Sequence, residues 1–244
     1  MNKNIREPKP QAFLDLSSID WKRAEESLNT LGYSHTSQVV WPKACLELRQ
    51  MYSNEKLFRK RIVMEHHNFG IGDYAYFAEP LPKLVLTLRN ELYERLAPIA
   101  NRMMHAIRLK HAYPPTLMQF RKLCHAVGQT KPTPLMLHYE AQGFNCLHRD
   151  LYGPTVFPLQ AMVMLSRKNE EFEGGEFVLV ENRPRQQSRA TVLTPNLGDL
   201  IIFPVSDRAV PGKREMLRAS MRHGVSRIKK GKRWTLGIIF HDAK

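Results

Sequence analysis

The sequence predicts an α+β protein, with helices in its first half and an antiparallel sandwich or jelly roll in its second half. Apolar residues recur at three- to four-residue spacing before residue 130. After it, short apolar and β-branched runs alternate with turn residues. The Pro-containing segment 131–134 separates the two patterns. We therefore expect a mostly helical N-terminal region, 1–130, packed on a β core, 131–244, as one compact unit.

Capping residues delimit the expected helices. Asp20 is a suitable N-cap for the first helix, Pro42 suits the first turn of the second, and a Leu-rich helix follows Pro82. Pro98 should bend or divide that third helix. The expected helical ranges are 21–31, 42–52, 84–103 and 116–127.

The expected strands are short and evenly spaced, which is typical of an antiparallel sandwich or jelly roll. Turn residues such as Gly174-Gly175 and Asn196-Leu197-Gly198 punctuate them. The strand ranges are 135–139, 159–165, 176–180, 199–203 and 234–240.

Composition indicates a globular protein with an anionic partner. The 244 residues carry a net charge of +14, which favours nucleic acid or another anionic substrate, although a basic surface can also serve solubility alone. The three widely spaced cysteines are expected to be reduced thiols that fill the core. No apolar run is long enough to span a bilayer and the N-terminus lacks a signal-peptide pattern, so we expect a cytoplasmic protein with no membrane contact.

The most informative pattern is a set of metal-ligating residues. His148 and Asp150 are separated by one residue, so on a strand their side chains share a face, and His223 is expected to reach them from a distant strand. Two imidazoles and a carboxylate hold Fe(II) while leaving positions open for O2 and a co-substrate. We predict that His148, Asp150 and His223 are the metal ligands and form the catalytic centre.

A second group of residues suits a carboxylate of 2-oxoglutarate. Arg233 and Thr235 share a strand face ten residues after His223, and a guanidinium and a hydroxyl together hold a carboxylate. Tyr139 is placed to donate its phenol from a neighbouring strand. The predicted cofactors are therefore Fe(II) and 2-oxoglutarate, with O2 as co-substrate.

The same residues also fit other roles, both catalytic and purely structural. A zinc hydrolase uses the same ligand types, but it gives Arg233 no role. His148 alone is compatible with a core histidine, and Tyr139 with an ordinary strand aromatic. Glu65-His66-His67 is rich in ligand atoms, yet adjacent residues of a strand face opposite ways, so we expect surface or substrate-loop positions.

Basic residues gather near the predicted site. Ten Lys or Arg lie between positions 208 and 233 against one acid, Glu215, and Arg183, Arg185 and Arg189 form a second basic loop. These segments are expected to frame the mouth of the site and concentrate phosphate-bearing substrates, the alternative being a solvated basic face. The aromatic residues that either stack on a base at the entrance or belong to the core are Phe69, Tyr74, Tyr76, Phe77 and Tyr152.

The chain resembles the bacterial Fe(II)/2-oxoglutarate-dependent oxygenases grouped as predicted nucleic-acid oxygenases, thought to remove alkyl lesions from damaged DNA. The segments that carry the resemblance are residues 58–59 with Met64, 69–74, 147–153, 172–177, 184–189 and 222–226. The resemblance implies a double-stranded β-helix with an N-terminal helical extension, iron ligation by His148, Asp150 and His223, and 2-oxoglutarate binding by Arg233. Tyr139 is similar to a tyrosine of prolyl hydroxylases and DNA-dealkylating dioxygenases, whereas Asn145 and His138 depart from the pattern.

The principal hypothesis is an Fe(II)- and 2-oxoglutarate-dependent dioxygenase that hydroxylates a C–H bond, with oxidative dealkylation of N-alkylated bases in nucleic acid, a DNA-repair reaction, as the expected activity. One alternative is a hydroxylase of a small anionic metabolite, nucleotide or peptide. A second is a non-catalytic basic module that binds nucleic acid on a jelly-roll scaffold. The sequence leaves the oligomeric state open.

Overall fold

The computed structural model describes residues 13–110, 112–213 and 215–244, and local sequence explains where its helices begin. Asp20 accepts a hydrogen bond from the backbone of Arg23, and Thr116 from that of Gln119, so both act as N-caps. The helices are α1 (Trp21–Thr30), α2 (Pro42–Met51), α3 (Lys83–Ala106) and α4 (Leu117–Ala126), with short 3-10 turns at Leu16–Ser18, Glu55–Leu57 and Met64–His67.

Helix α3 is not divided at Pro98, contrary to one of the two expectations from the sequence. A proline inside a helix removes one backbone hydrogen bond. The residues around it, Leu96, Ala97, Ile99 and Ala100, are buried in the core, and this packing holds the helix continuous.

Two antiparallel sheets form the β core. The larger sheet has seven strands in the order β1-β11-β7-β15-β5-β4-β2. Its strands are β1 (Ser34–Thr36), β2 (Phe58–Val63), β4 (Asp73–Phe77), β5 (Leu135–Tyr139), β7 (Leu159–Met164), β11 (Leu200–Pro204) and β15 (Arg233–Ile238). All of its pairings are antiparallel, as the short strands and turn signals predict.

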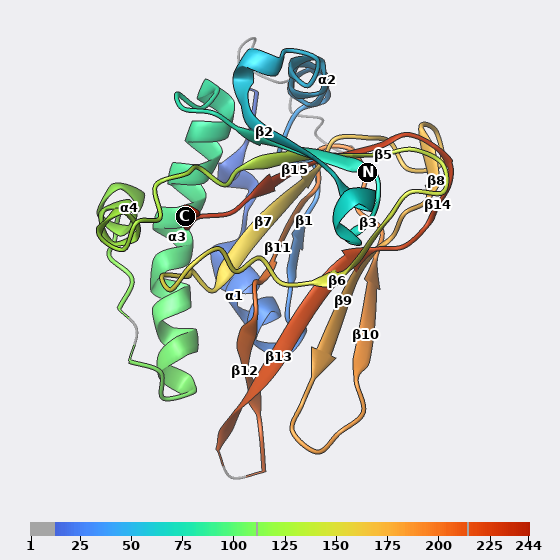
Figure 1. Ribbon diagram of the computed structural model, residues 1–244. Coiled ribbons are helices and arrows are strands. Elements are labelled where there is room, and N and C mark those ends of the chain that lie inside the picture. The colour runs from blue at the N-terminus through green and yellow to red at the C-terminus, as the bar shows by residue number, and fades with distance from the viewer. Residues whose placement is uncertain (1–12, 111, 214) are drawn as a thin grey trace, which may run out of the picture.

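The smaller sheet has the order β10-β9-β13-β6-β3, with β12 paired to β13. Its strands are β3 (Gly70–Ile71), β6 (Phe144–His148), β9 (Phe177–Asn182), β10 (Arg189–Leu193), β12 (Asp207–Pro211) and β13 (Met216–Val225). A two-stranded ribbon of β8 (Phe172–Gly174) and β14 (Ile228–Gly231) lies at one end of the sheets (Figure 1).

The sheets face each other, and the helices cover the outer face of the larger sheet (Figure 1). Strand β7 shows the alternation: Met162 belongs to an apolar cluster with Phe177 of the smaller sheet, whereas Val163 belongs to the large core cluster that includes Leu88 of α3. One strand thus contributes to both layers of the core. Within the described residues, no helix combines the length and apolar character needed to cross a membrane.

Residues 58–77 contribute β2, β3 and β4, although the sequence predicted a mostly helical region up to residue 130. Strand β4 pairs with β5, so the two predicted regions are joined by backbone hydrogen bonds across residue 131. The basic and polar residues of β2 hide its period-two pattern, because β2 lies at the edge of the sheet and has exposed side chains.

Candidate active site

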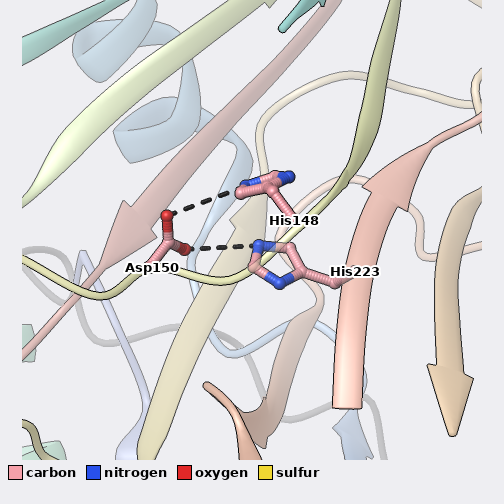
Figure 2. A group of neighbouring side chains, drawn as sticks. All are labelled: His148, Asp150 and His223. Atoms are coloured by element: carbon pink, nitrogen blue, oxygen red, sulfur yellow. Dashed lines mark ion pairs between the residues drawn. The ribbon is translucent and has the colours of Figure 1, made fainter. Parts of the chain in front are cut away.

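Three side chains converge between the sheets. His148 ends β6, Asp150 follows it, and His223 of β13 lies opposite His148. Nε2 of His223 is 3.3 Å from Oδ2 of Asp150, and Nε2 of His148 is 3.7 Å from Oδ1, so both imidazoles face the carboxylate (Figure 2). One ligand atom from each residue lies within 4.8 Å of the others, which suits a single metal ion.

Asp150 lies beyond the end of β6, not on the strand beside His148 as the spacing suggested. Its position is fixed by other contacts. The hydroxyl of Tyr152 donates to Oδ1 of Asp150 at 2.7 Å, and Nε2 of His241 lies 3.1 Å from the Asp150 backbone oxygen. The residue therefore reaches the site without a strand ladder to hold its backbone.

The protonation states suit a divalent metal. Nδ1 of His148 lies 2.8 Å from the carbonyl oxygen of Cys146, so Nδ1 carries the proton and Nε2 is free to bind. Burial lowers the pKa of His223, and the charge of His148 lowers it further. Burial alone would raise the pKa of Asp150, but the hydrogen bond and charge of His223 keep it well below its usual value. Asp150 is thus ionised, as a metal ligand must be.

A cavity of about 370 Å³ adjoins the triad, and Arg233 lies in its wall. The Arg233 side chain is fully enclosed, yet none of its three guanidinium nitrogens has a hydrogen-bond partner among the described residues. Burial lowers the pKa of Arg233 to about 10, so the group remains charged at neutral pH. An enclosed cation without a partner is costly, which indicates that this position receives an anion.

Tyr139 and Thr235 also line this cavity, together with Asn145. Tyr139 lies opposite Arg233 in the pairing of β5 with β15, and its hydroxyl accepts a hydrogen bond of 3.3 Å from the Asn145 amide. Thr235 is buried two residues further along β15, so its side chain lies on the same face of the strand as that of Arg233. The three residues predicted to hold an oxoacid therefore share one wall on the larger sheet, whereas His223 lies on the smaller sheet.

Sequence reasoning missed several polar groups at the site. Gln160 of β7 is buried, and its Nε2 lies 3.3 Å from Nε2 of His223, while its Oε1 has no hydrogen-bond partner among the described residues. Cys146 was expected to fill the core, but it is exposed and lines the cavity, and His241 contacts the backbone of Asp150. Tyr152 could have been identified as a site residue from the sequence, because it belongs to the segment 147–153 that carries the family resemblance.

The predicted aromatic residues divide between mouth and interior. Phe69 is 46% exposed at the edge of the cavity and its ring stacks on His67, with 5.3 Å between the ring centroids. Tyr74 and Tyr152 line the cavity, whereas Tyr76 and Phe77 are buried. Met64–His67 is a 3-10 turn beside this edge rather than a strand, and His66 and His67 are exposed.

The basic run from 208 to 233 does not form one surface. Arg218 and Lys213 belong to the β12–β13 hairpin, which projects at one end of the molecule, whereas Lys229 and Lys230 lie on β14 at the far end (Figure 1). Arg208 is fully buried, because it pairs with Glu181 and donates to carbonyl oxygens at the end of α1.

Glu181 also engages the second basic loop. Its carboxylate accepts Arg183 at 2.6 Å and Arg189 at 3.2 Å, in addition to Arg208 at 2.9 Å. Arg185, at the exposed tip between β9 and β10, adopts a left-handed backbone conformation with φ of 59°. The predicted basic frame is therefore partly neutralised by an internal acid.

Fold and site together define the class of protein. Two facing antiparallel sheets hold a two-histidine, one-carboxylate donor set, which is typical of non-haem Fe(II) oxygenases and leaves coordination positions open. Arg233 supplies the anion-binding group that an oxoacid co-substrate requires and that a zinc hydrolase does not explain. These features are those of an Fe(II)- and 2-oxoglutarate-dependent oxygenase.

Sequence comparison gives the family. Residues 72–243 match a family model described as an oxygenase catalysing oxidative methylation of damaged DNA. The chain is also 42% identical over 169 residues to an uncharacterized protein of Mycobacterium tuberculosis strain CDC 1551, which spans 69% of this chain and 72% of the relative. The chain belongs to this oxygenase family, so it is an enzyme and not the non-catalytic module considered above.

Solved structures agree on the fold. A prolyl-4-hydroxylase of Pseudomonas putida superposes with a TM-score of 0.53 at 12% identity, covering 89% of this chain and 96% of the other. The non-haem α-ketoglutarate-dependent epimerase SnoN from nogalamycin biosynthesis gives a TM-score of 0.54 at 13% identity, covering 89% and 80%. The predicted jelly-roll core with helical additions is confirmed.

Proposed function

We propose that this protein hydroxylates the alkyl group of an N-alkylated base in nucleic acid. The observation that carries the proposal is one cavity that contains both the His148–Asp150–His223 triad and the guanidinium of Arg233, which no described residue hydrogen-bonds. In the proposal the triad binds Fe(II), and Arg233 binds the far carboxylate of 2-oxoglutarate through paired hydrogen bonds.

The oxoacid wall has complementary roles for its other residues. The hydroxyl of Thr235 donates to the same carboxylate as Arg233, because both side chains lie on one face of β15. The Tyr139 ring packs against the guanidinium, with its centre 5.6 Å from Cζ, and its phenol adds a donor. Tyr139 stays protonated, since burial raises its pKa.

When bound, Fe(II), 2-oxoglutarate and O2 supply the oxidising chemistry that converts a C–H bond to C–OH while 2-oxoglutarate becomes succinate and CO2. An alkyl group on a base nitrogen then becomes a hemiaminal, whose C–N bond breaks to release an aldehyde and the restored base. The protein's own contribution is to orient both substrates and to exclude water. The apolar lining residues that exclude it are Leu135, Leu137, Met162, Phe177 and Phe203.

Three features support nucleic acid as the substrate. The family description specifies damaged DNA. The net charge of +14 favours a polyanion. Phe69, Leu147 and Arg149 line the same cavity, and the exposed ring of Phe69 suits stacking on an unpaired base.

Succinate release tests the proposal. Methylated single-stranded oligonucleotides should stimulate succinate and formaldehyde formation in equal amounts, because each hydroxylation yields one of each. Unmethylated oligonucleotides of the same sequence are the matched substrate control, and His148→Ala the matched enzyme control. Stimulation that requires neither the methyl group nor His148 would contradict the proposed reaction.

Hydroxylation of a small anionic metabolite or nucleotide is the second candidate, and the engagement of Arg183, Arg189 and Arg208 by Glu181 favours it. Because these arginines are already paired with Glu181, less of their charge is available to a long phosphate backbone. A strong succinate response to free nucleotides, with none to oligonucleotides, identifies this candidate.

For either substrate we infer a cytoplasmic location, which the free thiols Cys45, Cys124 and Cys146 favour.

A further inference from the structure

We propose that Tyr152 and His241 are positioning residues that hold Asp150 in place to bind the metal. The inference rests on the proposed ligand set of His148, Asp150 and His223. Asp150 follows the end of β6, where strand hydrogen bonds do not fix its backbone. His148 and His223, by contrast, lie within paired strands.

Tyr152 fixes the Asp150 side chain. Its hydroxyl donates to Oδ1 at 2.7 Å, and it accepts in turn from the hydroxyl of Tyr76 at 3.0 Å. Tyr76 is itself held, because it is buried and the guanidinium of Arg59 lies 4.5 Å from the centre of its ring. The chain of contacts from β2 through Tyr76 leaves the phenol of Tyr152 one direction in which to donate.

His241 fixes the Asp150 backbone, and its hydrogen bonds define its tautomer. The backbone N–H of Phe157 donates to Nδ1 at 3.4 Å, so Nδ1 carries no proton. The proton is therefore on Nε2, which donates to the carbonyl oxygen of Asp150 at 3.1 Å. His241 is completely buried, so water does not compete for either bond.

The two contacts act on different parts of one ligand. Oδ1 of Asp150 is engaged by Tyr152, which orients the carboxylate plane and leaves Oδ2 toward His223. The backbone bond from His241 prevents the loop from carrying the carboxylate away from the histidines. Hydrogen-bond partners behind metal ligands set ligand orientation, and their loss weakens metal binding by about 10–100-fold.

A measurement of metal affinity in the absence of turnover tests this inference. Mn(II) accepts the same nitrogen and oxygen ligands as Fe(II) and is followed by the electron paramagnetic resonance of the free ion. Tyr152→Phe keeps the ring and removes the donor, so Mn(II) should bind about 10–100-fold more weakly. Tyr93→Phe is the matched control, because it removes a buried phenol bonded to the Pro114 carbonyl at 3.0 Å in the helix-side core; its affinity should match wild type.

The outcomes are distinguishable. Wild-type Mn(II) affinity in a folded Tyr152→Phe protein overturns the inference, as does an equal loss in Tyr93→Phe. If Tyr152→Phe does not fold, Tyr76→Phe, which loosens the Tyr152 hydroxyl but keeps it, should give a smaller loss, and wild-type affinity there overturns the inference. His148→Ala tests the ligand set separately: unchanged binding in that variant contradicts the proposed triad itself.

Discussion

Arg233 and Tyr139 lie directly opposite each other on paired strands, and the guanidinium carbon lies 5.6 Å from the centre of the phenol ring. This ring contact is electrostatically favourable, but it does not replace the hydrogen bonds that the five N–H groups of the guanidinium can donate. The guanidinium has no hydrogen-bond partner among the described residues. The folded protein thus maintains a buried cation whose hydrogen bonds await a ligand.

Arg233→Met should therefore stabilise the ligand-free protein while strongly weakening oxoacid binding. Removing an unsatisfied buried polar group lowers the free energy of the folded state by about 1–3 kcal/mol, which corresponds to about 2–4 °C in Tm per kcal/mol for a chain of this size. Binding of 2-oxoglutarate should weaken more than a hundredfold, since two charged hydrogen bonds are lost.

Calorimetry and the visible charge-transfer band of the anaerobic Fe(II)–oxoacid complex measure the two effects. Arg233→Lys is the comparison variant, because it keeps the charge and loses the paired geometry. A fall in the Tm of ligand-free Arg233→Met would contradict the interpretation of an unsatisfied cation.

Asp242→Asn should destabilise the fold in a pH-dependent way. Burial alone would raise the pKa of Asp242, but the charges and hydrogen bonds of Arg89 and Arg121 lower it below its usual value. The folded state therefore binds this proton less readily than the unfolded state, so the stabilisation is complete above the unfolded-state pKa of about 4 and is lost as pH falls below it.

At pH 7 the cost of Asp242→Asn should be about 3–5 kcal/mol, because it leaves Arg89 buried without a counter-charge. The difference from wild type should narrow below about pH 4, as measured by urea unfolding across the range. Asp207→Asn is the matched control: its partner Arg218 is exposed, so the cost should be about 1 kcal/mol or less. A difference that stays constant with pH would exclude the carboxylate charge as its cause.

Cys146 should be the fast-reacting thiol of the folded protein. It is exposed, whereas Cys45 and Cys124 are buried, and burial raises the pKa of Cys45 to about 12. A disulfide reagent should modify one thiol quickly in native protein and all three in denaturant. Cys146→Ser should remove the fast phase, and its persistence would show that a buried thiol becomes accessible.

Phe69→Ala should raise KM for an oligonucleotide substrate with little change in stability. Stacking of a base on an aromatic ring contributes about 1–3 kcal/mol, or about 5–150-fold in binding. Phe13→Ala, at a ring of similar exposure that does not line the cavity, should leave KM unchanged. Equal KM values for all three proteins would remove Phe69 from the substrate site.

The ligand pattern was predictable because it is local chemistry. His148 and Asp150 lie close in sequence, and Arg233 follows His223 at a spacing that fits one strand and its turn. Helix α1 was likewise predictable from Asp20 and its apolar period. Nearby residues mark each of these features in the sequence, although it is the pairing of β13 with β6 that brings His223 to His148.

The supports of the site were not predictable, because they depend on distant pairing. His241 reaches Asp150 across 91 residues, and nothing near His241 in the sequence marks that contact. The joining of β4 to β5 is equally non-local, and it makes residues 73–77, to which no element was assigned from the sequence, part of the larger sheet. Gln160 was not predicted because the other residues of β7 are apolar, so the segment has the pattern of a buried strand.

The three arginines around Glu181 change what salt experiments would report. A phosphate that recruited Arg183 or Arg189 would exchange one anionic partner for another and leave the enclosed Glu181 carboxylate with fewer counter-charges. Fewer cations would then be displaced from the nucleic acid than the number of basic side chains implies. Affinity on this side of the molecule should consequently respond less to ionic strength than the number of its basic side chains implies.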